Sequence, residues 1–464
     1  MPRDAVVIGA SIAGLIAAKV LSARFQRVTV IDRDVLPTDV EPRAGVPQGR
    51  HGHGLLASGA DALERLFPGF HRDVAAAGAI PGDVIGNVRW FQHGYYKAQF
   101  DSGLRGILLT RPLLEQTLRR MVKALPNVTI EDNTHVLELL ADKDGRQVTG
   151  VRSRRGPTTA TYEDVALVVD ASGRSSRAGE WLARLGYEPP AESRVAVDLG
   201  YTTRFFRRRS DDLNGDRGAI IAPDPRFGQR VGFMLAQEGE RWIVTLAGWL
   251  GEHPPTDAHG FAEFARTLPR PDIYDVISRA EPLSDAVAYA FPANLRRHYE
   301  RLTRLPEGYV AIGDAVCSFN PFYGQGMSVA ALEGLLLERC LAQGTHDLAR
   351  RFYREARGII DTPWMIAAGS DFAFAGVTGN KPAGTDAINW YLQYVHRVAS
   401  TDQTVCRAFF DVANLLKPAT TLFSPRIVGR VLLGSLRADG DTASATRRSE
   451  PGREAERHVM LSGR

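Results

Sequence analysis

The sequence predicts an α/β fold that combines a parallel sheet, a separate antiparallel sheet and a C-terminal helical region. Two β-branched runs, 5–8 and 28–31, flank a helical pattern and predict a βαβ unit. Long alternating runs over 195–206, 230–236 and 242–249 predict antiparallel strands. Aromatic-rich helical sequence follows. At 464 residues the chain exceeds one typical domain, and its 44% hydrophobic content allows sizeable cores.

The first βαβ unit has the features of a dinucleotide-binding, Rossmann-like fold. The first strand ends at Gly9, the helix opens around Gly14, and the second strand closes on Asp32. Gly9 permits a tight turn, Gly14 lets helix and strand pack closely, and the helix N-terminus offers free N–H groups to a pyrophosphate. Asp32 is expected to accept hydrogen bonds from an adenosine ribose. Ser11 stands in place of the usual middle glycine. A secretory signal would not continue into a second strand that ends in an acid.

The composition excludes several classes of function. Lys and Arg total 57, Asp and Glu total 53, and the net charge is +4, with arginines interleaved among acids, so no nucleic-acid partner is expected. No apolar run reaches the roughly 18 residues that span a bilayer, so no integral membrane segment is expected. Three scattered cysteines, Cys317, Cys340 and Cys406, predict neither a disulfide framework nor a zinc site. A cytoplasmic protein without a metal is expected.

The chain after the first unit is expected to complete the same domain. A Gly/Pro/His-rich loop, 42–54, precedes a helix at about 55–67, and such loops are more often functional than linkers. Alternating aromatic residues over 87–100 predict strands. Thr110 is the expected N-cap of the next helix. Four strand-like runs between residues 128 and 169 then return the chain to the parallel sheet.

The remaining chain predicts a second sheet, a return segment and helices. Helices are expected near 259–267 and 273–280, and a buried strand at 309–313 precedes a long helix to about residue 342. The expected organisation is a nucleotide-binding domain at 1–185, with 80–107 contributing to the substrate side, an antiparallel-sheet substrate domain at 186–292, the second part of the nucleotide-binding domain at 293–345, a C-terminal helical region at 346–435 and a disordered tail at 436–464.

Two further motifs carry a resemblance to a known superfamily. Gly313-Asp314 ends a strand, and Pro321-Phe-Tyr-Gly-Gln-Gly326 opens a long helix. This pattern resembles the flavin monooxygenases of the p-hydroxybenzoate hydroxylase superfamily, which implies FAD. There the aspartate hydrogen-bonds the ribityl chain, and an arginine matching Arg111 lies near the ribose and pyrophosphate. The helix N-terminus would favour an anionic reduced flavin. The expected cofactor contacts are Gly9, Ser11, Ala13, Gly14, Asp32, Arg33, Arg43, Arg111, Asp314, Pro321, Gly324, Gln325, Gly326 and Met327.

Three blocks narrow the resemblance: residues 45–56, 241–248 and 313–327. Together they look like the bacterial flavin epoxidases of polyether ionophore pathways, of the lasalocid and monensin type, which are relatives of squalene epoxidase. Similarity runs to about Leu433. The resemblance implies an oxidoreductase that uses O₂, through a flavin C4a-hydroperoxide, to epoxidise alkenes of an apolar polyketide or terpenoid intermediate in antibiotic or other specialised metabolism.

The same resemblance places the 43–54 loop along the flavin. The cofactor carries the oxygen chemistry, so no catalytic acid–base pair is required. Arg43, Gln48 and His51 are the candidate catalytic residues, with positioning roles. A metal pair formed by His51 and His53 would lack a third ligand. Cys317 is expected to be a small buried residue and not a nucleophile. The aromatics of the second sheet and C-terminal helices together favour a large apolar pocket.

Electron supply and reaction type stay open at this level. The 170–176 segment corresponds to a superfamily fingerprint associated with NAD(P)H binding, but Ser172 stands where that fingerprint has aspartate. Electrons are therefore expected from NAD(P)H directly or through a partner flavin reductase. The alternatives are a flavin hydroxylase, a geranylgeranyl-reductase-like alkene reductase and, less favoured, a non-enzymatic FAD-binding protein. A flavin halogenase would be expected to show Trp-x-Trp-x-Ile-Pro, which is absent.

Overall fold

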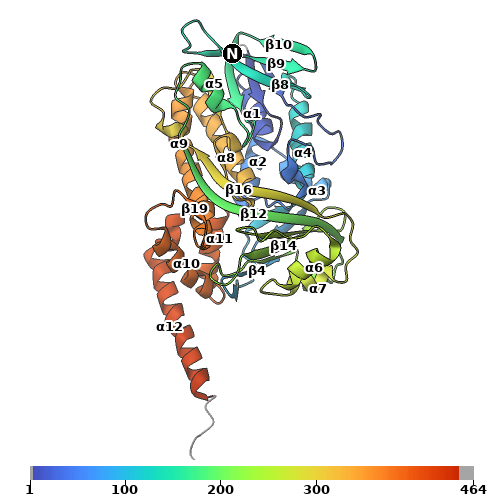
Figure 1. Ribbon diagram of the computed structural model, residues 1–464, viewed down its shortest axis with the longest axis vertical. Coiled ribbons are helices and arrows are strands. Elements are labelled where there is room, and N and C mark those ends of the chain that lie inside the picture. The colour runs from blue at the N-terminus through green and yellow to red at the C-terminus, as the bar shows by residue number, and fades with distance from the viewer. Residues whose placement is uncertain (1–3, 449–464) are drawn as a thin grey trace, which may run out of the picture.

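A five-stranded parallel sheet lies at one end of the molecule (Figure 1). The structure, a computed structural model, describes residues 4–448, with side chains up to residue 436. The predicted βαβ unit is confirmed, with α1 (Ile12–Ser22) as its crossover helix. The strands lie in the order β17 (Tyr309–Ala311), β11 (Val165–Asp170), β1 (Asp4–Ile8), β2 (Arg27–Ile31) and β7 (Val128–Glu131), and all neighbours run parallel.

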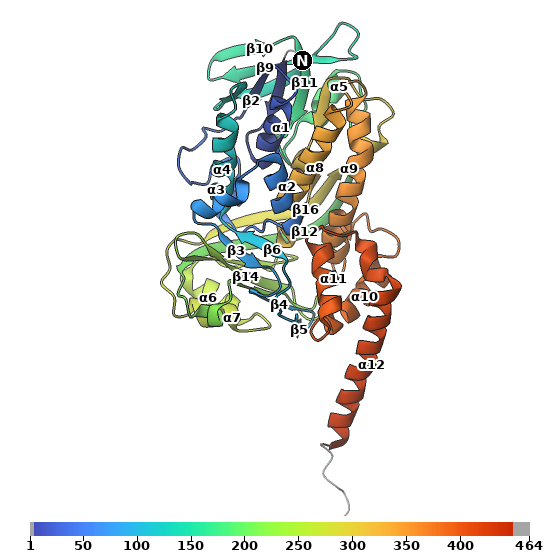
Figure 2. The same ribbon diagram turned by 180° about the vertical axis from the view of Figure 1, so that it is seen from behind.

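Helices pack beside this sheet, as Figure 2 shows from behind. Helix α1 contacts both α4 (Arg111–Lys123) and α8 (Gly326–Leu341). As predicted, Thr110 caps α4, because its side-chain oxygen accepts the N–H of Leu113. Strands β1 and β2 each bury four of their five residues, which is typical of parallel strands covered on both faces. Shorter helices, α2 (Ala57–Leu66), α3 (Phe70–Ala76) and α5 (Ala178–Arg184), complete this region.

The four strand-like runs between residues 128 and 169 do not all join the parallel sheet. Strands β7 and β11 do, but β8 (His135–Ala141) and β9 (Val148–Arg155) pair with β10 (Thr158–Tyr162) in a separate antiparallel sheet. The expected return of the chain to the parallel sheet is confirmed by β11, whereas the middle two runs form a separate sheet. Their connections are too short for the crossover that parallel neighbours need, and they favour hairpins instead.

A nine-stranded sheet crosses the middle of the molecule (Figure 1). Its neighbours are antiparallel except β4 and β13, which run parallel. Residues 80–107 contribute β4 and β5 to it and also form a two-stranded ribbon, β3 (Ile80–Asp83) with β6 (Arg105–Leu108). Helices α6 (Ala258–Arg266) and α7 (Asp272–Ile277) pack against it. Its strands are β4 (Val88–Gln92), β5 (Tyr95–Tyr96), β12 (Glu192–Arg207), β13 (Gly218–Ile221), β14 (Arg230–Gln237), β15 (Arg241–Gly248), β16 (Val287–Arg297), β18 (Cys317–Ser318) and β19 (Thr378–Gly379).

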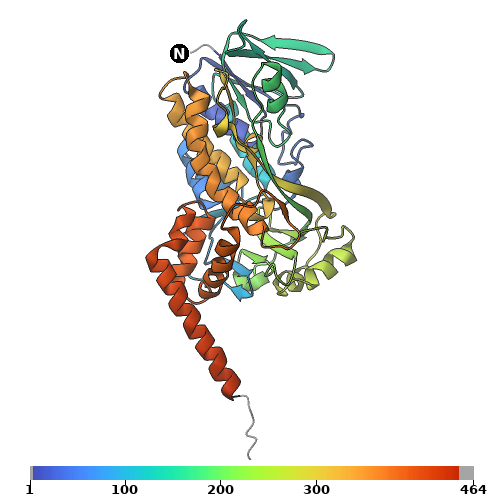
Figure 3. The same cartoon turned by 60° about the vertical axis from the view of Figure 1, so that its left-hand side comes forward.

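The C-terminal helices lie beside the nine-stranded sheet (Figure 3). Helix α9 (Leu348–Trp364) carries Pro363 near its end and continues into a π-helical turn, Met365–Gly369. Helices α10 (Thr385–Val398), α11 (Gln403–Ala413) and α12 (Pro425–Arg448) follow. No helix among residues 4–448 is long and apolar enough to cross a membrane.

Helix α12 corrects the expectation of a disordered tail. The tail was expected over 436–464, because that segment has little apolar content. The helix instead continues through 436–448 to Arg448, and residues 449–464 lie outside the described part of the chain. Low apolar content alone does not end a helix, since alanine and arginine propagate it well and a single glycine costs only about 1 kcal/mol.

Candidate functional site

A cavity of about 760 Å³ lies at the carboxyl ends of the parallel strands, and we call it the nucleotide cavity. Gly9 follows β1, Asp32 follows β2, Ser172 follows β11, and Gly313 follows β17, and all four line it. Strand ends and helix N-termini meet at this edge of an open α/β sheet, which is where such sheets bind ligands. The sequence motifs therefore converge on one site.

The glycine turn at the start of α1 has the predicted geometry. Gly9 adopts φ +102°, a left-handed conformation that favours glycine. A Cβ on Gly14 would lie 1.8 Å from the carbonyl oxygen of Gly9, so only glycine allows helix and turn to approach this closely. Ser11 is the N-cap residue of α1, and Ser11 and Ala13 line the cavity. The first N–H groups of α1 have no acceptor within the helix and suit a phosphate.

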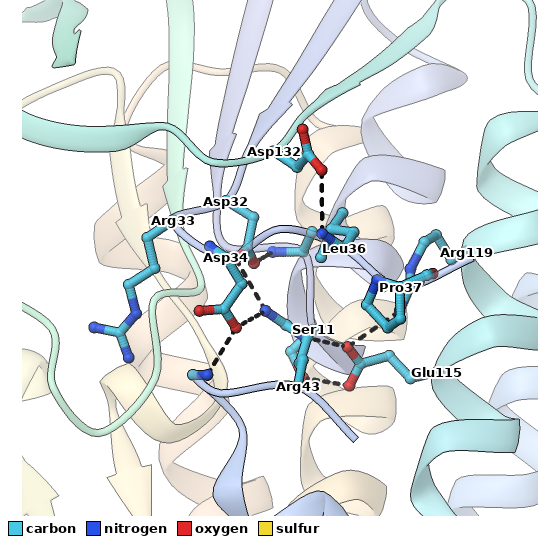
Figure 4. Close-up of polar contacts among 12 residues, drawn as sticks. Ser11, Asp32, Arg33, Asp34, Leu36, Pro37, Arg43, Glu115, Arg119 and Asp132 are labelled. Atoms are coloured by element: carbon cyan, nitrogen blue, oxygen red, sulfur yellow. Dashed lines mark hydrogen bonds and ion pairs between the residues drawn. The ribbon is translucent and has the colours of Figure 1, made fainter. Parts of the chain in front are cut away.

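Asp32 sits in a buried cluster of charged side chains, drawn in Figure 4. Its Oδ2 accepts the N–H of Ala10 at 2.6 Å, which holds the acid against the glycine turn. Its Oδ1 accepts the N–H of Asp34 and a guanidinium N–H of Arg43, both at 2.9 Å. The carboxylate faces the cavity at the end of β2, as a ribose-binding acid does in this kind of fold.

Arg43 lies in the Asp32 cluster, which corrects its expected place on the flavin face. Its guanidinium pairs with Asp32 at 2.9 Å and with Asp34 and Glu115 at 2.7 Å each, and only 8% of the residue is exposed. Three carboxylates hold one cation here, because the loop after residue 42 folds back against the end of β2. Arg43 also lines the cavity, beside Asp32, so its position fits the end that would hold an adenosine ribose.

Arg111 and Ser11 form the phosphate-facing side of the same cluster. Arg111 donates from Nη2 to the Ser11 hydroxyl at 2.9 Å, and that hydroxyl donates to Glu115 at 3.1 Å. The Nε of Arg111 is buried without a hydrogen-bond partner among the described residues, although it lies 3.8 Å from the Glu115 carboxylate, and Arg111 lines the cavity. Arg33 also lines it, and its guanidinium is 3.4 Å from the Ser175 hydroxyl. These cations fit a bound pyrophosphate.

The 170–176 segment is a loop organised by one buried acid. Asp170 is fully buried and accepts the hydroxyls of Ser172 and Ser176 at 2.6 Å each and that of Tyr309 at 3.0 Å. The loop presents Arg174 to the cavity, where its guanidinium lies 4.8 Å from the centre of the Phe291 ring. The sequence drew attention to this segment without singling out Arg174.

Asp314 and the start of α8 form the far end of the cavity. No described residue donates a hydrogen bond to the Asp314 carboxylate; removal from bulk water raises its pKa, and the charges of Arg111 and Arg174 oppose this rise. Helix α8 begins at Gly326, where a Cβ would make ordinary van der Waals contact with Asp314 Oδ1 at 3.7 Å. Gly324 adopts φ +65° just before it. A free carboxylate, an open cradle and helix N–H groups thus face the same space.

A buried acid from the C-terminal helices supports this end and was missed by the sequence analysis. Asp371, fully buried after the π-helical turn, accepts hydrogen bonds from Asn294 at 2.7 Å, Trp249 at 3.0 Å and Asn320 at 3.0 Å, and from the Tyr323 hydroxyl at 3.1 Å. Burial raises its pKa to about 6. It holds the segment before Gly324 against the nine-stranded sheet. An isolated Asp after a helix carries no sequence signal for such a role.

Of the residues predicted to act in the 42–54 loop, some line the nucleotide cavity and others are buried in the core. Gln48 lines the nucleotide cavity, whereas His51 lines neither cavity and is 3% exposed. The His51 Nδ1 lies 2.9 Å from the Thr203 hydroxyl, and burial lowers the pKa of the imidazole to about 4. His53 lines both cavities, and burial lowers its pKa to about 3. Of the two histidines in this loop, His53 therefore lines the cavities and His51 does not.

Three aromatic side chains close the nucleotide cavity from the nine-stranded sheet: Tyr201 from β12, and Tyr289 and Phe291 from β16. The rings of Tyr201 and Tyr289 lie 5.3 Å apart. The Tyr201 hydroxyl is buried without a partner among the described residues. A strand was predicted at Tyr201 but not over 287–297, and none of the three residues was named, because alternation shows which residues share a face and not what that face meets.

A second cavity, of about 450 Å³, adjoins the first, and we call it the apolar cavity. It lies between the nine-stranded sheet, the β3–β6 ribbon and the C-terminal helices, with Trp90, Phe233, Trp364 and Phe409 among its walls. The two cavities share a wall formed by His53, Gly54, Pro321, Gly324 and Gln325.

The residues of the nucleotide cavity fit a dinucleotide with a further ring system. The Asp32 end suits a ribose, Arg111 and α1 suit a pyrophosphate, and the unpaired Asp314 suits a polyhydroxy chain. Gln325, 1% exposed, leaves both its amide atoms without partners among residues 4–436. Buried polar atoms are rarely left unpaired unless a ligand or water completes them. These features together fit FAD, with its ring system at the shared wall.

Comparison with known proteins identifies a relative that matches nearly the whole chain. The chain is 34% identical over 462 residues to Protein Rv3254 of Mycobacterium tuberculosis, and the match covers 94% of each chain. The chain belongs to the family of Protein Rv3254. No model of a known protein family matches it.

Solved structures similar to this chain include flavoproteins and a monooxygenase. A flavoprotein/dehydrogenase from Cytophaga hutchinsonii gives a TM-score of 0.66 at 16% identity, covering 95% of this chain and all of that one. The flavin-dependent brominase Bmp2 gives 0.64 at 14% identity, over 95% and 99% of the two chains. The p-nitrophenol 4-monooxygenase PnpA from Pseudomonas putida gives 0.62 at 16% identity, over 89% and 99%. At these identities the fold alone is shared: it is the fold of FAD-dependent monooxygenases and halogenases.

Proposed function

We propose that this protein is an FAD-dependent monooxygenase that transfers oxygen from O₂ to an apolar small molecule. The observation that carries the proposal is the shared wall, where the nucleotide cavity and the apolar cavity meet at Gly54, Gly324 and Gln325. A flavin in the first cavity and a substrate in the second would touch there. The flavoprotein descriptions of the similar structures support the same class.

The chain's own residues bind, orient and exclude water. Asp32 would hold the adenosine ribose, Arg111 and the start of α1 the pyrophosphate, and Asp314 the ribityl chain. The N–H groups at the start of α8 face the ring system and would stabilise negative charge on it. FAD supplies the redox chemistry with O₂ when it is bound. The apolar walls keep the reacting atoms away from bulk water.

We propose epoxidation of an alkene in a polyketide or terpenoid intermediate as the reaction, on the three blocks that resemble the polyether-pathway epoxidases. Hydroxylation of a similar substrate and alkene reduction are the competing outcomes. Electrons come from NAD(P)H, directly or through a partner flavin reductase. No lysine lines either cavity among the described residues, which disfavours a halogenase with a catalytic lysine.

The first test is cofactor content. Purified protein is expected to release FAD on heating, measured by chromatography, and Asp314→Ala should weaken FAD binding by about 1.5–3 kcal/mol because a hydrogen bond to a charged group is lost. Asp61→Ala, an exposed acid on α2, is the matched control. Bound FMN or NAD in place of FAD, or unchanged FAD affinity in Asp314→Ala, contradicts the assignment.

The second test is the source of oxygen in the product. Farnesol and retinol, as apolar polyene probes, are incubated with the reduced holoenzyme under ¹⁸O₂, and the products are analysed by mass spectrometry for the label and by NMR for the number of remaining double bonds. Epoxidation adds one labelled oxygen and removes a double bond, whereas hydroxylation adds the label and keeps every double bond. Products that gain hydrogen without label would show an alkene reductase and overturn the proposal.

A further inference from the structure

The acidic side chains that line the apolar cavity already have partners. Asp83 accepts the N–H groups of Ile85 at 2.9 Å and of Gly103 at 2.7 Å, as well as the Ser102 hydroxyl at 2.6 Å. Asp361 accepts a guanidinium N–H of Arg296 at 2.7 Å. Neither acid is therefore available to neutralise a cation that lines the cavity.

The apolar cavity has one such cation. Arg217 is the only Lys or Arg among the described residues that line it, and its side chain is half-buried. No ion pair or hydrogen bond joins its guanidinium to any residue between 4 and 436. The acids beside it are occupied, because Arg89 pairs with Asp216 at 2.8 Å and with Asp272 at 3.0 Å.

The backbone fixes where Arg217 stands. Its N–H donates to the Asn87 carbonyl at 2.7 Å, and its carbonyl accepts the N–H of Ala236 at 2.9 Å, so the residue is held between β4 and β14. Its Nη1 would lie 3.3 Å from a Cβ placed on Gly82, so the guanidinium leans over the β3–β6 ribbon. The ribbon has glycine at this point, which leaves room for the arginine head group.

We propose that Arg217 binds a carboxylate on the substrate, so that the apolar cavity takes a long apolar carboxylic acid. This inference rests on the proposed function in taking the cavity as the substrate site. A guanidinium stays charged at all relevant pH values and grips a carboxylate through two parallel hydrogen bonds. Apolar walls strengthen the attraction, because the local dielectric is lower than that of water. A single unpaired cation matches a monoanion and would leave a phosphate dianion half-neutralised.

The anchor also sets which part of the substrate reaches the shared wall. Ile220, three residues along β13 from Arg217, pairs with Phe233 across the sheet. Phe233 packs against Gly52, where a Cβ would come within 2.2 Å of its ring. Strand residues rise ~3.3 Å each, so Arg217 lies ~10 Å along the sheet from this contact with the 42–54 loop. The reacting atom would therefore lie several carbons away from the carboxylate.

The test uses the FAD-loaded full-length chain and two probes of the same shape. Undecylenic acid, an alkene carboxylic acid, and its neutral primary amide are titrated by isothermal calorimetry. We expect Arg217→Gln to weaken binding of the acid by about tenfold or more and to leave the amide unchanged, since only the charged hydrogen bonds are lost. Arg217→Lys should retain part of the preference for the acid.

Two variants control for placement and charge. Arg207→Gln removes an arginine of β12 whose side chain is 47% exposed and lines neither cavity. This variant should bind both probes with unchanged affinity. Leu392→Trp narrows the apolar cavity and should weaken the binding of both probes to the same extent. Equal losses of acid and amide in Arg217→Gln, or an equal loss of the acid in Arg207→Gln, would overturn the inference. Calorimetry requires no turnover, so acid-selective binding that depends on Arg217 stands even if oxygen transfer fails.

Discussion

The nucleotide cavity and the apolar cavity share a wall but are built in opposite ways. The first is made by turns at strand ends and by buried charges that satisfy one another, as in the Asp32 cluster. The second is made by side chains from the 52–56 loop, the β3–β6 ribbon, three strands of the nine-stranded sheet and the C-terminal helices. One depends on exact backbone geometry and charge balance, and the other on volume. Substitutions in the nucleotide cavity should therefore impair both folding and cofactor binding. Substitutions in the apolar cavity should impair substrate binding alone.

Arg43→Gln should have the largest effect. It leaves Asp32, Asp34 and Glu115 close together in a buried site without their shared cation, and breaking a buried charge pair costs about 3–5 kcal/mol. Urea denaturation measures this loss. Arg72→Gln is the control, because the ion pair of Arg72 with Asp73 is exposed and worth about 1 kcal/mol at most. Normal stability with a fall only in turnover per bound FAD would return Arg43 to a catalytic role.

Gly14→Ala should come next. The added Cβ would meet the Gly9 carbonyl oxygen at 1.8 Å, and neither the turn nor the helix can move without losing the other's contacts. We expect a loss of about 3 kcal/mol in unfolding free energy and protein that purifies without flavin. Gly358→Ala on α9 has nothing within 4 Å and should stabilise by about 0.5–1 kcal/mol. Equal behaviour of the two variants would show that the turn is not tight.

Glu333→Gln tests a buried proton beneath the nucleotide cavity. Glu333 accepts the Gly313 N–H at 2.6 Å, and burial raises its pKa to about 8 from an ordinary value of 4.5. Between these pH values the unfolded chain holds fewer protons than the folded one, so stability falls as pH rises through the window. The glutamine of the variant cannot ionise. The free energy of unfolding of the variant, relative to that of the parent, should therefore rise by roughly 2–3 kcal/mol between about pH 5.5 and 7.5. A constant difference across that range would contradict a protonated Glu333.

Leu392→Trp should have the smallest effect of these substitutions. That effect should be confined to the apolar cavity. Leu392 lines this cavity from α10, and a larger ring there displaces substrate volume. Affinity for undecylenic acid should fall about tenfold, or ~1.4 kcal/mol, with FAD content unchanged. Leu433→Trp, at a position on α12 that is 60% exposed, is the matched control. Loss of FAD in Leu392→Trp alone would show that the cavities are not independent.

The same contrast explains what the sequence could predict. Gly9, Asp32 and Gly313 follow strands in contiguous motifs, and their place in the parallel sheet follows from rules for βαβ units. The position of Arg43 could not be predicted from these rules, because it depends on where a loop without regular structure folds back against the sheet. His51 and His53 are separated by one residue, and only the packing of the loop decides which of them faces a ligand.

The apolar cavity was predicted only as a property of the aromatic composition. Arg217 carries no motif, and it was proposed as a binding residue because its guanidinium has no ion-pair or hydrogen-bond partner among the described side chains, which becomes visible only when β4 and β13 pair and the β3–β6 ribbon lies beside them. Asp371 likewise accepts hydrogen bonds from the residue after β15, from β16 and from the segment before Gly324, which are far apart in sequence. When single residues from distant parts of the sequence meet in space, no local sequence pattern predicts that they will do so.

The position of β17 in the parallel sheet has a consequence for synthesis. The ribosome delivers β11 at residue 170, but its neighbour β17 arrives only at residue 309, after the nine-stranded sheet is largely made. Until then β11 lies at the rim of a four-stranded sheet, with unpaired backbone groups that can template pairing with another chain. Domains emerge N-terminal first, and such intermediates aggregate. The nascent chain therefore has its greatest need of a chaperone while residues 171–308 are being translated.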